Sequence, residues 1–133
     1  MAGDPVQAAS EPDLAILQGC WEQVGFEEGG LADSPDEHGG MGAITTIEGR
    51  RFVVRAIGGE LLLKGTFTLD ATVSPKAITW VDAIGADAGK HLPASYVLDS
   101  DRFVFIAADE GVQRPTVFRT GPGQVMRSFV RKR

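Results

Sequence analysis

After residue 18 the chain consists mostly of short apolar or alternating segments separated by residues that favour turns. Alternation with a period of two places every second side chain on one face of a strand, whereas a helix repeats every 3.6 residues. Such segments occur at residues 19–26, 43–48, 52–57, 61–69, 77–81, 94–98, 102–107, 116–119 and 124–131. The pattern therefore predicts eight or nine short strands.

The connections between these segments predict how the strands pair. Glu48-Gly49 and Gly58-Gly59 are typical of hairpin turns, as are residues 99–101 and 109–111. Short turns pair neighbouring strands in antiparallel fashion, and closing the sheet removes its two exposed edges. We therefore expect an all-β fold, a closed antiparallel up-and-down barrel of eight to nine short strands.

The barrel domain is expected to span residues 14–133. Residues 1–13 are rich in Ala, Pro, Ser and acidic residues, which predicts a mobile N-terminal arm. Asp13 is the expected cap of a short helical turn through Leu14 and Leu17. These 133 residues are of a size that usually forms one domain.

Charge is distributed unevenly along the chain. Residues 1–48 contain ten acidic residues and no Lys or Arg, so all thirteen basic residues lie later. Closure of the barrel would bring the first and last strands together, which predicts that Glu22 lies near Arg127 or Arg131. The only basic cluster is at the C-terminal tail, too small a surface to predict nucleic-acid binding.

The cysteine content and the lengths of the apolar runs indicate where in the cell such a protein is expected. Cys20 is the only cysteine, so the chain forms no internal disulfide, and its first residues lack the pattern of a signal peptide. No apolar run is long enough for a transmembrane helix. We expect a cytoplasmic protein without membrane contact, either a monomer or a weak dimer.

Several short motifs occur in order along residues 14–133. They are Leu-Gln-Gly-Cys-Trp at 17–21, Gly-Thr-Phe-Thr-Leu-Asp at 65–70, Pro-Lys-Ala-Ile at 75–78, Tyr-Val-Leu-Asp at 96–99 with Asp-Arg-Phe at 101–103, and Arg-Pro-Thr-Val-Phe at 114–118. The ordered set resembles an uncharacterised bacterial lipocalin-like domain family. This resemblance implies a lipocalin-like barrel and carries no assigned activity.

The pair Gly19 and Trp21 is also similar to the opening motif of true lipocalins. There the Trp closes one end of the barrel and stacks on an Arg near the last strand. The resemblance implies the same structural role for Trp21, with Arg127 and Arg131 as the candidate partners. A guanidinium plane covers an indole face well.

The aromatic residues suggest where a site would lie. Within their strands they alternate with other residues so that each strand has one apolar face, and six of them are the candidate ligand-binding residues: Phe52, Phe67, Trp80, Tyr96, Phe103 and Phe105. An eight-stranded barrel is either filled by its own side chains or holds one small ligand. The sequence leaves both alternatives open.

Two further groups of residues are candidates for a lid, a metal site or an acid–base pair. The acidic, Gly-rich segment from Glu27 to Gly42 is a candidate lid, but its spacing fits no calcium or zinc site. His91 with Tyr96 or Asp82 is a candidate acid–base pair. Motifs for a serine hydrolase, a phosphate loop or a dinucleotide site do not occur, and no metal or cofactor is expected.

The leading hypothesis from the sequence is a barrel that binds a small, mainly apolar ligand. One alternative is a tailoring enzyme with its active site in the barrel lumen. The other is a protein-interaction or scaffolding domain with a filled barrel.

Overall fold

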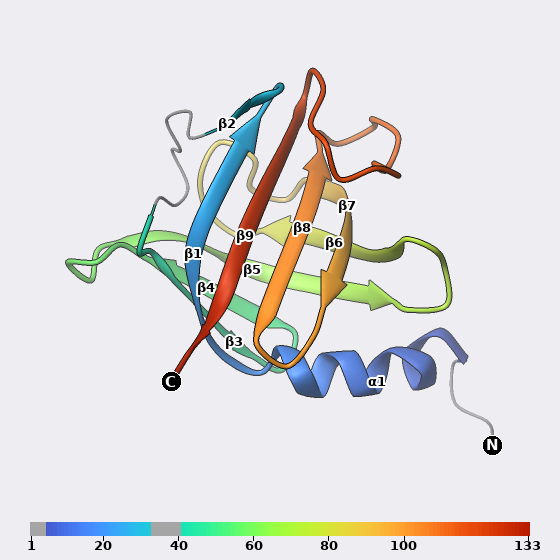
Figure 1. Cartoon of the computed structure of the whole chain (residues 1–133), viewed down its shortest axis with the longest axis horizontal. Helices are drawn as coiled ribbons and strands as arrows, with labels where there is room; N and C mark the ends of the chain where they lie inside the picture. Colours follow the sequence, from blue (N-terminus) through green and yellow to red (C-terminus); the bar gives the residue numbers. More distant parts are fainter. Residues whose placement is uncertain (1–4, 33–40) are drawn as a thin grey trace.

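The computed structural model describes residues 5–32 and 41–133, which form one helix and nine strands (Figure 1). The elements are α1 (Pro5–Leu17), β1 (Gly19–Glu28), β2 (Leu31–Ala32), β3 (Ile44–Glu48), β4 (Arg51–Arg55), β5 (Leu61–Asp70), β6 (Lys76–Asp82), β7 (His91–Leu98), β8 (Arg102–Ala108) and β9 (Gln124–Lys132). Neighbouring strands pair in antiparallel fashion from β3 to β9, as the short turns predicted. Only the two-residue β2 lies outside the ring of strands, where it pairs with the end of β1.

The first and last long strands close the barrel. β1 pairs with β3 on one side and with β9 on the other, so the closed up-and-down barrel of eight strands is confirmed (Figure 1). Its charge pairing differs from the prediction. Glu22 lies opposite Val130 and its carboxylate is 3.7 Å from the Lys132 ammonium, because Arg127 and Arg131 have the opposite parity on β9 and point into the barrel.

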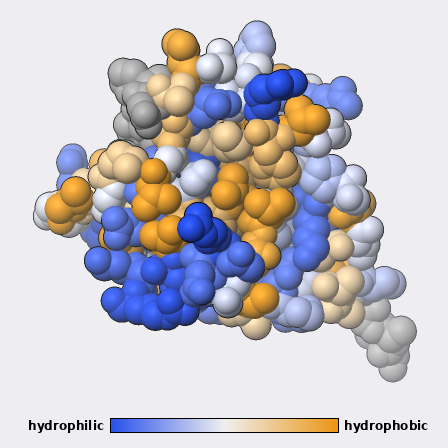
Figure 2. All heavy atoms as spheres, viewed as in Figure 1, coloured by the Kyte–Doolittle hydropathy of each residue, from blue (hydrophilic) through white to orange (hydrophobic). Residues whose placement is uncertain are grey.

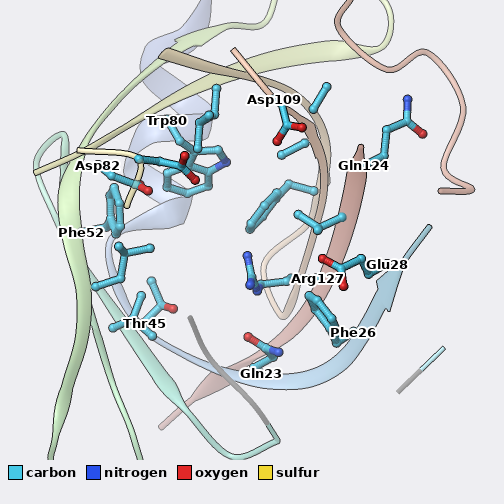
Figure 3. A pocket seen from close by; sticks show the side chains of 18 of the residues that line it. Gln23, Phe26, Glu28, Thr45, Phe52, Trp80, Asp82, Asp109, Gln124 and Arg127 are labelled. Carbon is cyan, nitrogen blue, oxygen red and sulfur yellow. The ribbon is translucent and has the colours of Figure 1, made fainter. Parts of the chain in front are cut away.

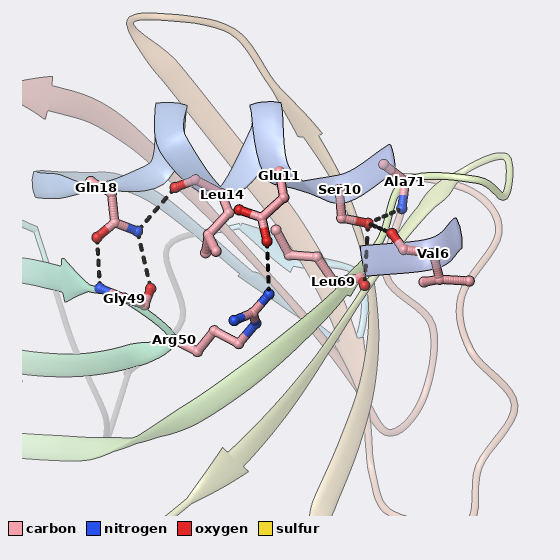
Figure 4. A network of polar contacts seen from close by, with 9 residues as sticks. All are labelled: Val6, Ser10, Glu11, Leu14, Gln18, Gly49, Arg50, Leu69 and Ala71. Carbon is pink, nitrogen blue, oxygen red and sulfur yellow. Dashed lines mark hydrogen bonds and ion pairs between the residues drawn. The ribbon is translucent and has the colours of Figure 1, made fainter. Parts of the chain in front are cut away.

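Helix α1 covers one end of the barrel, so residues 5–13 of the expected N-terminal arm are helical in the structure (Figure 4). Ser10 is buried and its hydroxyl accepts a hydrogen bond of 3.0 Å from the Ala71 N–H at the end of β5. The Gln18 amide donates to the Gly49 carbonyl and accepts from the Gly49 N–H, at 3.0 and 2.6 Å. The helix is thus fixed to strand connections at its middle and just beyond its C-terminal end.

Asp13 does not begin a helical turn, because α1 starts at Pro5 and passes through it. Its carboxylate instead accepts a hydrogen bond of 2.7 Å from the Tyr96 hydroxyl and forms an ion pair of 3.0 Å with Lys76. Burial, followed by this hydrogen bond, raises the pKa of Tyr96 well above its ordinary value. The phenol therefore remains a donor that ties the barrel to the helix.

The closed end is completed by Trp21 and Arg131, as the resemblance to lipocalins implied. Trp21 is fully buried, its indole N–H donates to the Leu17 carbonyl at 2.8 Å, and the Arg131 guanidinium lies 4.3 Å from its ring centroid. Arg131 also donates to the carbonyls of Ile16, Gln18 and Ser100. The last strand thereby supplies the cation that the C-terminal turn of α1 lacks.

The predicted strand at residues 116–119 is not formed. The connection from β8 to β9 instead runs over the outside of the barrel, because β9 pairs directly with β8 and leaves no free edge. Arg114 holds this connection in place by donating to the carbonyls of Ile78 and Ala94 at 2.9 and 2.5 Å. The Ser95 hydroxyl donates to the Pro115 carbonyl at 2.5 Å.

The outer surface carries apolar side chains over the front strands β1, β9 and β8 (Figure 2). Val24 on β1 and Val97 on β7, the strand that pairs with β8, are both exposed. Among the residues that the structure describes, no helix is long and apolar enough to cross a membrane.

Candidate functional site

The barrel interior has two halves of different character. The half beside α1 is packed solid, whereas the opposite end keeps a cavity of about 450 Å³ that opens beyond the ends of β1 and β8 (Figure 3). Side chains from all eight barrel strands and from the β6–β7 connection line the cavity. The closed and open ends are therefore built from the same strands at different depths.

The six predicted site residues are all buried, but they divide between these halves. Phe52, Trp80 and Phe105 line the cavity. The other three do not border it and belong to the packed core: Phe67, Tyr96 and Phe103. Alternation predicted which side chains face inward, and the depth along the barrel decided which of them meet the cavity.

A β-bulge in β1 brings further residues into the lining that alternation alone does not predict. The pairing of β1 with β9 shifts between Gln23 and Gly25, so that Gln23 on one side and Phe26 and Glu28 on the other all line the cavity. Val24, the extra residue, points outward. The sequence signal was Gly25, where a glycine interrupts an apolar strand.

The aromatic wall of the cavity is centred on Trp80. Its ring lies 5.0 Å from that of Phe52 in a perpendicular arrangement and 4.9 Å from that of Phe105 in a tilted one. Gly65 on β5 makes room for this packing, because a Cβ there would lie 2.1 Å from the Val81 carbonyl and 2.9 Å from Phe52. The wall is therefore rigid on the side that faces β5.

Trp80 also holds an unusual polar atom. Within the part of the chain that the structure describes, its indole nitrogen is the only buried side-chain nitrogen or oxygen with no hydrogen-bond partner. Figure 3 shows this nitrogen at the edge of the ring that faces the cavity. Buried polar groups nearly always find partners, so an unpaired donor in a cavity wall calls for an explanation.

A layer of polar side chains lies at the middle of the cavity. Gln23 and Thr45 are buried, and Arg127 reaches inward with its guanidinium 5.0 Å from the ring centroid of Phe26 (Figure 3). Arg127 is placed there by its position opposite Phe26 on β1 and Phe105 on β8. A hydrogen-bonding belt thus interrupts the apolar lining.

The mouth of the cavity is acidic. Four carboxylates line it, each at a strand end or in a connection: Glu28, Asp82, Asp87 and Asp109. Arg127 is the single cation among the lining residues that the structure describes. No local sequence pattern predicts this ring, because the four residues are far apart along the chain and only the barrel brings their segments to one end.

The proposed acid–base pairs are not formed as expected. His91 is exposed and its neighbour Leu92 lines the cavity, so alternation along β7 directs the imidazole outward. Tyr96 lies at the opposite end of the barrel, engaged with Asp13. Asp82 is buried in the cavity wall, on the other side of the sheet from the imidazole.

The proposed lid between Glu27 and Gly42 falls partly outside the described residues, which omit 33–40 and with them His38. Glu27 itself has a structural role, since its carboxylate accepts hydrogen bonds of 2.5 and 2.8 Å from the hydroxyl and N–H of Thr120. These hydrogen bonds hold the pKa of Glu27 below its ordinary value. In the described ranges, no group of three or more potential ligands could hold a metal ion.

Comparisons with protein-family models, with curated proteins and with solved structures found no match for this chain. Its closed β-barrel and buried aromatic cluster are compatible with a lipocalin-like ligand-binding fold.

Proposed function

We propose that this protein binds one small, mainly apolar molecule in the open end of a lipocalin-like barrel. The observation that carries the proposal is the cavity of about 450 Å³, which remains although the other half of the lumen is densely filled. Small-molecule sites are typically concave, lined mostly by apolar and aromatic groups, and contain a few polar groups that fix orientation.

The size of the cavity supports a ligand larger than a solvent molecule. An engineered apolar cavity of about 150 Å³ is known to bind benzene, and sites for drug-sized ligands begin near about 300 Å³. The lining combines the aromatic side chains of Phe52, Trp80 and Phe105 with the polar groups of Gln23 and Arg127. This composition suits a ligand with an apolar body and few polar atoms.

The structure of the closed end also supports the proposal that the open end binds a small molecule. The contacts of Trp21, Arg131 and α1 stabilise the barrel without using the residues around the cavity. At the open end the aromatic side chains of Phe52, Trp80 and Phe105 pack on one another and form one wall of the cavity. A preformed pocket loses less ordering entropy on binding than one that must assemble.

Native mass spectrometry of the full chain purified from its own host, compared with a denatured sample, tests the proposal directly. We expect an additional mass that is lost on denaturation. An uncharged fluorescent apolar probe such as N-phenyl-1-naphthylamine, used in parallel, should bind with a stoichiometry of one and be displaced by that molecule.

A cavity-filling variant makes the test specific. Ala107 faces the cavity on β8, so Ala107→Phe should weaken probe binding by more than about tenfold through loss of space. Val97→Phe adds a ring to the outer surface of the neighbouring β7 and is the matched control. Equal binding by both variants, with no additional mass in the native spectrum, would refute the proposal.

A further inference from the structure

The indole N–H of Trp80 indicates what the ligand must offer. The molecule's other tryptophan, Trp21, donates its N–H to the Leu17 carbonyl at 2.8 Å, so the fold can satisfy such a donor. Trp80 is 6% exposed and lines the cavity, yet its nitrogen has no hydrogen-bond partner. Leaving a buried donor unpaired is destabilising, and a hydrogen-bond acceptor on a ligand would remove that cost.

The aromatic neighbours of Trp80 determine how an acceptor reaches this donor. The nitrogen exposes less than 1 Å², so a ligand must first displace an adjoining side chain slightly. Phe52 and Phe105 adjoin the ring and also border the cavity, which gives them free space on one side. Because Phe52 packs tightly against Gly65, we infer that movement of the Phe105 ring is what lets a flat apolar ligand approach the nitrogen.

The charges at the mouth determine which acceptor is suitable. Glu28, Asp82, Asp87 and Asp109 line the cavity, and Arg127 supplies the one guanidinium among its described lining residues. A carboxylate ligand would enter this field at an electrostatic cost, because low-dielectric walls focus the potential of like charges on the cleft. The protein as a whole also carries a formal charge of −5.

We propose, on the basis of the binding function above, that the ligand is an uncharged, flat, apolar molecule bearing a carbonyl-type acceptor, whose oxygen accepts a hydrogen bond from the Trp80 indole N–H. The aromatic wall contacts its apolar body and the acidic mouth selects against its carboxylate analogues. Fatty acids and other organic anions are accordingly poor ligands.

A matched set of naphthalene probes tests this inference by equilibrium dialysis with the full chain. The set consists of 2-acetylnaphthalene, which carries the carbonyl, 2-isopropenylnaphthalene, a hydrocarbon of the same shape, and 2-naphthoate, the anion. We expect the ketone to bind about threefold to tenfold more tightly than the hydrocarbon, as for one net neutral hydrogen bond. The naphthoate should bind more weakly than the ketone, with a difference that narrows as salt is added.

Substitutions then assign the hydrogen bond. Trp80→Phe keeps an aromatic ring and removes the donor, so the ratio of ketone to hydrocarbon affinity should fall to about one. Phe105→Leu alters the same wall but keeps the donor, and should change both affinities while preserving their ratio. Because each variant is judged by a ratio, a general loss of cavity shape cancels.

The outcomes separate the two proposals. If the hydrocarbon binds but the ketone has no advantage, or the ratio survives in Trp80→Phe, the ligand class is wrong while the binding function stands. Tighter binding of naphthoate than of the ketone would also overturn the inference, and failure of all three probes to bind would count against both proposals.

Discussion

Arg131 offers the sharpest test of how the closed end stabilises the barrel. Its guanidinium lies over Trp21 at 4.3 Å and donates to carbonyls of Ile16, Gln18 and Ser100. Two of those carbonyls belong to the end of α1 and the residue after it, and the third to the β7–β8 turn. One side chain thus joins the helix, the first strand and a distant turn.

The magnitude follows from counting these contacts. Three hydrogen bonds contribute about 1 kcal/mol each and the contact with the indole about 0.5–1 kcal/mol, so Arg131→Ala should lower the free energy of unfolding by about 3.5–4 kcal/mol. For a domain of this size the melting temperature should fall by about 10 °C. Arg131→Lys keeps the charge but cannot reach three carbonyls, and should lose about half as much.

Urea unfolding followed by circular dichroism measures the effect. Arg133→Ala is the matched control, because Arg133 on the same segment makes an exposed ion pair with Asp101 and should cost less than about 0.5 kcal/mol. The reasoning is refuted if Arg131→Ala costs no more than Arg133→Ala, or if Arg131→Lys is as stable as the wild type.

Two further predictions concern the barrel wall and its outer connection. Gly65→Ala should destabilise the protein by about 3 kcal/mol or more, because its Cβ would meet a backbone carbonyl that cannot move away, whereas Gly58→Ala, with open space around it, should be nearly neutral in the same urea titration. Glu27→Gln should be less stable than the wild type at neutral pH, and the difference should vanish in acid. The folded-state pKa of Glu27 is lowered by Thr120, so its contribution is present above the unfolded-state pKa and is lost as the pH falls through the folded-state value. A difference that persists at pH 2 would contradict this assignment.

Local sequence patterns were sufficient to predict the barrel fold, but not which side chains border its cavity or what covers its outside. Period-2 alternation and turn residues fix strand pairing through short-range rules, and the chain's two ends then meet because closure removes the edges. Residues 116–119 have the same composition as a strand but lack a free edge to pair with. Residues 5–13 form a helix because Ser10 and its neighbours find partners on β5 and on the strand connections, which composition alone cannot indicate.

The candidate site could be predicted only in part for a related reason. Whether a side chain faces the barrel interior depends on its odd or even position along the strand. Whether it borders the cavity depends on how far along the barrel axis it lies. Phe105 and Phe103 on β8 share parity, but Phe105 borders the cavity and Phe103 lies in the packed half. The acidic mouth was hidden because Glu28 and Asp109 are far apart in the chain and meet only through the pairing of β1 with β9 and of β9 with β8.

Strand β9 contributes side chains both to the closed end, which stabilises the barrel, and to the cavity, where we propose that the ligand binds. Its inward residues in succession are Arg131, which closes the end beside α1, Phe129, which belongs to the core, and Arg127, which lies in the cavity. Two arginines of the same strand thus serve opposite ends. The hydrogen bonds of Arg131 are all to backbone carbonyls, a pattern that depends on the fold and not on a ligand. Substitutions near Arg131 should therefore act on stability and leave the cavity intact, whereas substitutions around Arg127 should act on binding, since the closed end holds the barrel together without them.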